Sequence, residues 1–274
     1  MGWLPLAAAL APAVFMLHFV YVRDKYEREP LGRVLFIYFL AFFTVIPAAW
    51  FQAWFVTPER WGLAGVAVAA WGVIALSEES VKFIVLRYVA MPHRTFNEVY
   101  DGVLYGVTVS LGFATVENVA YVLISADRAI FVAILRALLS VPAHALWGAM
   151  MGYYIGLAKF EADARRRRTL LWLGWGIAVL WHGLYDFCAF GAEEAGGSMA
   201  AVLGFGLLAV VVLNWSIALR YIHKAQALSA FKRPSLLANP FAALRMSVKY
   251  CHHCGAPLPR PAAVCTRCGY RFPS

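Results

Sequence analysis

The sequence predicts an all-α polytopic membrane protein, a bundle of about seven transmembrane helices followed by a small C-terminal zinc-ribbon module. Of its 274 residues, 62% are hydrophobic and 14% are charged, whereas a soluble domain is about 45–50% apolar and about 25% charged. The apolar residues gather in runs close to the roughly 20 residues that one helical crossing of a bilayer needs. Two CxxC pairs near the C-terminus predict the separate metal-binding module.

Apolar runs bounded by charge, proline or glycine predict the individual spans. They lie near residues 4–22, 34–56, 63–87, 102–124, 129–157, 169–190 and 198–222. Basic residues concentrate after the first, third, fifth and seventh spans, as in the run 165–168, and the alternate connections are short and poor in basic residues. The positive-inside rule therefore predicts an N-terminus outside the cell and a C-terminus in the cytoplasm.

The net charge of +9 belongs mostly to the tail, because residues 230–274 hold seven Lys or Arg and no acidic residue. A basic tail can bind nucleic acid or lie beside an anionic membrane surface. For a tail tethered to a membrane body, we expect contact with the lipid bilayer or another protein and no nucleic-acid partner.

The tail contains two knuckles, Cys251-x-x-Cys254-Gly and Cys265-x-x-Cys268-Gly, separated by ten residues. Four thiolates can hold one Zn²⁺ in a closed, structural site, and a glycine after each pair allows the tight turn. A disulfide is the alternative, but a cytoplasmic segment is reducing. We therefore predict a membrane domain over 1–222, a linker over 223–249 and a cytoplasmic zinc ribbon over 250–274.

Ionisable residues occur inside the predicted spans, where each costs about 2.5–3.5 kcal/mol at the helix centre and needs a reason. The candidates are Glu78, Glu79, Lys82, Glu117, Arg136, His144, His182 and Asp186. Two pairs, Glu78 with Lys82 and His182 with Asp186, have the four-residue spacing that places them on one helix face. Glu78 and Glu79 lie about 100° apart on a helix, so we expect one of them to face a cavity.

These residue types support hydrolysis of a peptide bond. A carboxylate in a partly dry cavity can activate a water, and an imidazole from another helix can stabilise the oxyanion. Alternatively, His144, His182 and a carboxylate can hold a catalytic zinc. A third reading is a non-catalytic scaffold or transporter whose buried charges neutralise one another.

Motifs of other intramembrane proteases are missing from the sequence. It contains no HExxH zinc motif, no GxSG serine motif, and no GxGD beside the two Tyr-Asp pairs at 100–101 and 185–186.

Five motifs in order give the sequence a resemblance to a known family. They are EExxK at 78–82, YDGVLYG at 100–106, GFATVEN at 112–118, AHALWG at 143–148 and HGLYD at 182–186. Together they resemble the PrsW family of bacterial intramembrane proteases, distant relatives of the CAAX prenyl endopeptidases. Phe83 and Ser140 stand where the CAAX motifs EExxxR and FxxxH require other residues, which favours the PrsW side.

The resemblance implies a glutamic-type endopeptidase of the bacterial inner membrane that cuts a single-pass membrane protein, such as an anti-sigma factor. Carried over by position, its catalytic residues are Glu78, Glu79, Lys82, Glu117, His144, His182 and Asp186, and no catalytic metal is expected. Helix rise places Glu117 nearer the outer membrane half than Glu78 and His144, so it needs a tilted or broken helix to join them. Pro142 is a candidate for such a break.

Overall fold

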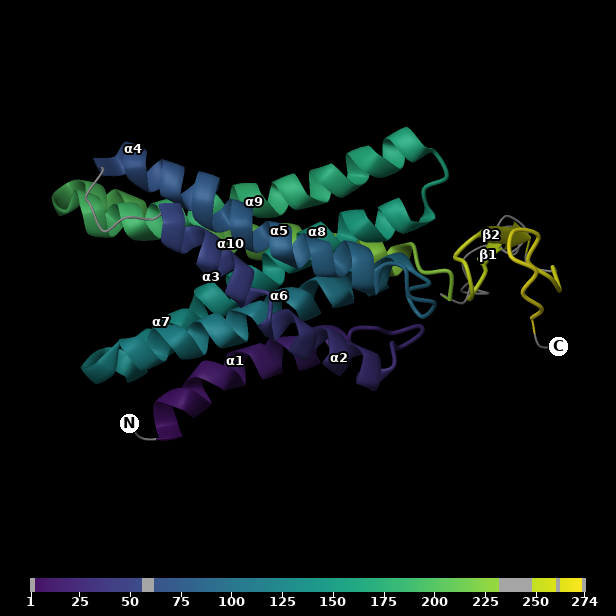
Figure 1. Cartoon of the computed structure of the whole chain (residues 1–274), viewed down its shortest axis with the longest axis horizontal. Helices are drawn as coiled ribbons and strands as arrows, with labels where there is room; N and C mark the ends of the chain where they lie inside the picture. Colours follow the sequence, from purple (N-terminus) through teal and green to yellow (C-terminus); the bar gives the residue numbers. More distant parts are fainter. Residues whose placement is uncertain (1–2, 56–61, 232–247, 260–261, 273–274) are drawn as a thin grey trace.

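The computed structural model describes residues 3–55, 62–231, 248–259 and 262–272. Long helices run side by side along the longest axis, and the C-terminal module lies beyond one end of the bundle, opposite the N-terminus (Figure 1). The α-helices are α1 (Trp3–Tyr21), α2 (Leu31–Phe42), α3 (Val45–Phe55), α4 (Gly62–Ala67), α5 (Leu76–Val85), α6 (Val99–Ile124), α7 (Ala129–Leu138), α8 (Ser140–Phe160), α9 (Ala164–Ala195) and α10 (Gly197–Ala227). Two π-helical segments, η1 (Val68–Ala75) and η2 (Leu86–Ala90), flank α5, and a 3-10 turn, η3 (Ala126–Arg128), precedes α7.

The predicted fold class is confirmed. Among the described residues, five helical segments are long and apolar enough to cross a membrane: Trp3–Tyr21, Leu31–Phe55, Val99–Ile124, Ala126–Phe160 and Gly197–Ala227. The other two predicted spans correspond to the continuous run from α4 to η2 and to α9, which carry the EExxK and HxxxD motifs. The final span extends further than predicted, to Ala227 instead of 222.

Two predicted spans are each divided into two helices, and a proline explains each division. Pro47 and Pro142 lie four residues after Phe43 and Leu138, where α2 and α7 come to an end. Proline offers no N–H to the carbonyl four residues earlier, and its ring clashes with that carbonyl. The break predicted at Pro142 therefore occurs one turn earlier in the chain, between α7 and α8.

Glycines allow α6 and α8 to pack closely at the centre of the bundle. A Cβ added at Gly106 would collide with the carbonyl oxygen of Gly148, and one at Gly102 would collide with that of Gly152. Small residues spaced four apart are the usual means by which membrane helices bring their backbones together. This close packing sets the positions of Glu117 on α6 and His144 on α8.

The C-terminal module is a small two-knuckle fold. Strands β1 (Val248–Tyr250) and β2 (Pro257–Pro259) pair antiparallel, and an isolated bridge joins Val264 to Arg271. The Tyr250 ring lies 5.1 Å from the ring of Phe160 at the end of α8. The module therefore contacts the end of the helix that carries His144.

Candidate active site

Helix α5 supplies a buried group of three ionisable side chains, Glu78, Glu79 and Lys82, which are 3%, 0% and 1% exposed. Lys82 Nζ lies 2.8 Å from Glu79 Oε1 and 3.4 Å from Glu78 Oε2. It also lies 4.2 Å from the centre of the Phe113 ring on α6. The ammonium therefore balances part of the negative charge that the bundle encloses.

His182 on α9 joins this group through both ring nitrogens. Its Nδ1 lies 2.8 Å from Glu79 Oε1, and its Nε2 lies 3.3 Å from Asp186 Oδ2 and 3.9 Å from Glu78 Oε2. The Trp147 ring stacks on the imidazole with a centroid distance of 4.3 Å. Because a carboxylate accepts only, Nδ1 carries the hydrogen that it donates to Glu79.

His144 on α8 connects Lys82 to Glu117. Its Nδ1 lies 3.1 Å from Lys82 Nζ, and its Nε2 lies 3.0 Å from Glu117 Oε2. An ammonium only donates, so Nδ1 accepts and the hydrogen on Nε2 is donated to Glu117. The division between α7 and α8 and the close α6–α8 packing thus bring Glu117 to the group. A broken helix was the condition that the sequence set for Glu117 to join Glu78 and His144.

Three further residues complete the site. Arg136 forms an ion pair with Glu117 at 2.9 Å, and its Nε donates to Asn118 Oδ1 at 2.9 Å. Gln52 Nε2 donates to Glu78 Oε1 at 3.2 Å. The sequence revealed Arg136 and Asn118 only as polar residues in spans, and nothing distinguished Gln52, because their roles depend on contacts between helices.

A cavity of about 550 Å³ opens beside these residues. The lining includes Glu78, Glu117, His144, His182 and Asp186, with Gln52, Arg136, Phe113 and Tyr185 among its other walls. Glu79 and Lys82 are not part of the lining and lie behind it. Of the two adjacent glutamates, Glu78 is therefore the one that faces the cavity.

The oxygens around His182 Nε2 create an electrostatic requirement. With Nδ1 donating to Glu79, a neutral imidazole would direct the lone pair of Nε2 at the oxygens of Glu78 and Asp186. Asp186 Oδ2 accepts no hydrogen bond from the described residues. A protonated imidazole, a protonated carboxyl of Glu78 or Asp186, or a bound cation satisfies these three atoms.

The amino-acid sequence is also similar to known proteins over most of its length. The sequence profile described as "PrsW family intramembrane metalloprotease" matches residues 29–217, which include every motif of the site. The chain belongs to the PrsW family of intramembrane proteases.

Curated relatives named Protease PrsW show the extent of the match. The PrsW of Geobacillus kaustophilus is 37% identical over 221 residues, covering 81% of this chain and 92% of the relative. The PrsW of Bacillus subtilis is 39% identical over 184 residues, covering 66% of this chain and 81% of the relative. No solved structure matches. This PrsW-family chain is accordingly a membrane peptidase by family.

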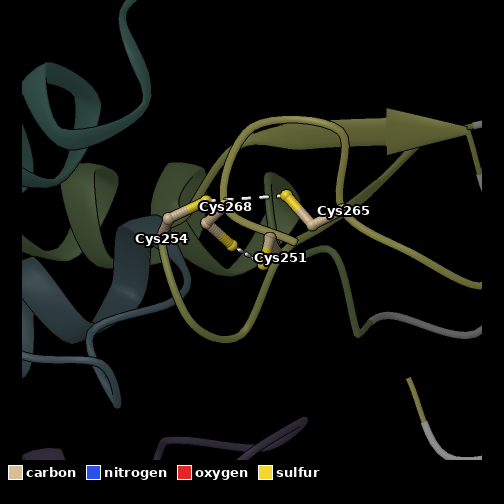
Figure 2. A group of neighbouring side chains, drawn as sticks. All are labelled: Cys251, Cys254, Cys265 and Cys268. Carbon is tan, nitrogen blue, oxygen red and sulfur yellow. Dashed lines mark hydrogen bonds between the residues drawn. The ribbon is translucent and has the colours of Figure 1, made fainter. Parts of the chain in front are cut away.

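A second site, outside the range that the family profile matches, is formed by the four tail cysteines (Figure 2). Cys251 Sγ lies 3.5 Å from Cys268 Sγ, and Cys254 Sγ lies 3.7 Å from Cys265 Sγ. Gly255 and Gly269, which follow the two pairs, have φ of +69° and +75°, the left-handed conformation expected for each knuckle. The four cysteines are free rather than bridged and lie close enough together to hold one metal ion.

Proposed function

We propose that this chain is an endopeptidase of the bacterial inner membrane that hydrolyses a peptide bond in a membrane-anchored protein, with Glu78 as the base that activates water. The observation that carries the proposal is the position of Glu78, which lines the cavity while Glu79 and Lys82 lie behind it. A carboxylate facing a cavity beside a fixed cation is suited to general-base chemistry.

In the proposed reaction, Glu78 accepts a proton from a water, and the water oxygen bonds to the substrate carbonyl carbon. The tetrahedral intermediate then breaks its C–N bond as Glu78 returns the proton to the leaving nitrogen. The products are a new carboxyl group and a new amine. His182, oriented by Glu79 through Nδ1, stabilises the oxyanion with a protonated Nε2.

Lys82 and Glu117 position the other groups. Lys82 lies within 3.4 Å of Glu78 and donates to Glu79 and His144, so it fixes the two carboxylates relative to each other. Glu117 accepts from His144 and pairs with Arg136. His144 is thereby held at the wall of the cavity, where it connects Lys82 to Glu117.

A zinc-dependent form of the same hydrolysis is the second candidate, and one observation favours it. Glu78, His144 and His182 each offer a ligand atom within 4.8 Å of the other two, and two histidines with one glutamate are a known catalytic zinc set. The unpartnered Asp186 oxygen beside His182 fits the same reading, as does the word metalloprotease in the family description. When bound, Zn²⁺ polarises the carbonyl and lowers the pKa of its water.

We propose a single-pass membrane protein as the substrate, with an anti-sigma factor as the class that the family resemblance suggests. The basic connections favour an N-terminus outside the cell and a cytoplasmic C-terminus. In that orientation the tail lies in the reducing cytoplasm, where the four cysteines hold structural Zn²⁺ instead of forming disulfides. Zn–S bonds of about 2.3 Å in a tetrahedron separate the sulfurs by about 3.8 Å, close to the 3.5 and 3.7 Å between the paired sulfurs here. The zinc ribbon would then be available to contact a partner protein in the cytoplasm.

The experiment is cleavage of a reconstituted single-pass substrate by the wild type and by Glu78→Gln, Glu79→Gln and His144→Ala. We expect Glu78→Gln to lose about 10²–10⁴-fold in rate, with Glu79→Gln losing less because its carboxylate only orients His182. Unchanged cleavage in all three variants would refute the proposal and favour a scaffold or transporter. Zinc analysis of a chain lacking residues 245–274 separates the two mechanisms, because zinc retained there belongs to the membrane site.

A further inference from the structure

Five carboxylates gather at the end of the bundle near the C-terminal module. This carboxylate cluster consists of Asp24, Glu27 and Glu29 in the α1–α2 connection, and of Glu98 and Asp101 at the start of α6. One oxygen from each of Asp24, Glu98 and Asp101 lies within 4.8 Å of the other two. Asp101 is 16 residues from Glu117 along α6, or about 24 Å at 1.5 Å per residue. The cluster is therefore distinct from the active site.

Most of the ten carboxylate oxygens are buried without a hydrogen-bond partner among the described residues. Asp101 Oδ2 accepts from the N–H groups of Asn97 and Glu98 at 2.7 and 2.8 Å, as expected for an acid at a helix N-terminus. Asp24 Oδ2 accepts from the N–H of Glu29 at 3.3 Å. The second oxygens, Asp24 Oδ1, Glu29 Oε1 and Asp101 Oδ1, are buried without a hydrogen-bond partner among the described residues. Helix capping thus accounts for part of the cluster only.

The basic side chains near the cluster, Arg28, Arg33 and Lys159, act on its carboxylates only at a distance. None of its five carboxylates forms an ion pair with Lys, Arg or His within the described ranges, although Asp24, Glu98 and Asp101 are 1%, 3% and 0% exposed. Arg28 directs its Nε at the backbone carbonyl of Asp24 instead of the carboxylate. Buried charges without a counterion are costly enough that a protein pairs them, protonates them or binds a cation.

A neutral side chain gives a separate indication of a ligand. Asn97 is 5% exposed and lies against Glu27, where its amide opposes the rise in the pKa of Glu27 that burial causes. Its carbonyl oxygen, Oδ1, has no hydrogen-bond partner in the described part of the chain. Protonation of the carboxylates relieves charge, but an amide oxygen also calls for a donor or a cation. Oxygen atoms of two chemical kinds therefore lack partners at one place.

Burial and the neighbouring carboxylates also act on the protonation of the cluster. Burial raises the pKa of Asp24 to about 7, and that of Glu98 to about 8, with Glu27 and Glu29 adding to both shifts. Binding of a cation near neutral pH therefore releases protons from the cluster.

We propose that the carboxylate cluster binds one hard divalent cation through Asp24, Glu98 and Asp101. The available donors are oxygens, without the His or Cys ligands that select zinc. Ca²⁺ takes oxygen ligands at about 2.3–2.6 Å, which agrees with ligand oxygens within 4.8 Å of one another. Mg²⁺ usually retains several waters, so the nearly complete burial of the three carboxylates favours Ca²⁺. The cation joins the α1–α2 connection to the start of α6, the helix that carries Glu117.

The test is calorimetric titration of the full-length, zinc-loaded protein in detergent micelles with Ca²⁺ alone and, in a separate arm, with Mg²⁺ alone. We expect one Ca²⁺ per chain. Asp24→Asn and Glu98→Gln should each weaken binding about tenfold or more. Asp127→Asn, which removes an exposed acid just after the C-terminal end of α6, is the matched control and should bind as the wild type does.

Thermal unfolding keeps the test decisive if a variant folds poorly. Millimolar Ca²⁺ should raise the melting temperature of the wild type and of Asp127→Asn, and should leave that of Asp24→Asn unchanged. Binding of Mg²⁺ alone would support the site and identify its cation. The proposal is overturned if the wild type shows neither heat nor a thermal shift with either ion at millimolar concentration, or if Asp24→Asn and Glu98→Gln bind as tightly as the wild type.

Discussion

Replacing Lys82 with methionine tests how the buried charges of the active site are held. Lys82→Met keeps most of the side-chain volume but removes an ammonium that is 1% exposed and lies 2.8 Å from Glu79 Oε1. Glu78 and Glu79 then remain buried without their shared cation. Breaking one partner of a buried ion pair costs about 3–5 kcal/mol, so we expect the free energy of unfolding to fall by that amount.

The assay is equilibrium unfolding in mixed micelles, followed by circular dichroism, with Lys224→Met as a control on an exposed lysine. The control should change stability by about 0.5 kcal/mol or less. Adding Glu79→Gln to Lys82→Met removes one of the two uncompensated charges and keeps an acceptor for His182, so it should recover about 1–3 kcal/mol. If the double variant is less stable than Lys82→Met by the full effect of Glu79→Gln alone, the two residues do not interact and the electrostatic reasoning is wrong.

Three further predictions concern other parts of the molecule. Gly106→Ala should destabilise the bundle by about 1–3 kcal/mol because its Cβ meets the carbonyl of Gly148, whereas Gly176→Ala, with open space around it, should be neutral or stabilising in the same unfolding assay. Cys265→Ser should abolish zinc binding by the isolated tail site, measured by metal analysis, and retention of a full zinc equivalent in the tail would contradict the four-thiolate site. Burial raises the pKa of Asp24 from 3.8 to about 7, so the unfolded chain ionises at this residue first as pH rises. In buffer free of divalent cations, the folded state should therefore lose stability between about pH 4 and about pH 7. A melting temperature that rises over this range would contradict the prediction.

Much of the fold was predictable because the sequence pattern of a membrane helix lies within one short stretch of the chain. Each apolar run is a property of neighbouring residues, and each ionisable residue inside a run is costly enough to indicate a role. The i, i+4 pairs Glu78 with Lys82 and His182 with Asp186 follow from helix geometry alone, and both contacts occur. The two helix breaks follow from proline chemistry, although the position of the break before Pro142 required the structure.

Contacts between helices were harder to predict. The choice of Glu78 over Glu79 as the cavity-facing carboxylate depends on the rotation of α5 relative to α6, α8 and α9. The contacts of Arg136 with Glu117 and of Gln52 with Glu78 depend on tertiary packing, which a single sequence does not specify. Asp101 appeared in the sequence only within a Tyr-Asp pair and the YDGVLYG motif, because Asp24, its partner in the carboxylate cluster, lies far from it in the chain.

The central claim is that the cavity carboxylate Glu78 activates the water that cleaves a membrane-anchored protein. It is tested most directly by the cleavage rates of wild type, Glu78→Gln and Asp127→Asn on one single-pass substrate in the same vesicles. The proposed mechanism predicts that Glu78→Gln loses about 10²–10⁴-fold, while Asp127→Asn, whose side chain is exposed, retains the wild-type rate. A folded Glu78→Gln protein that cleaves at the wild-type rate would contradict it.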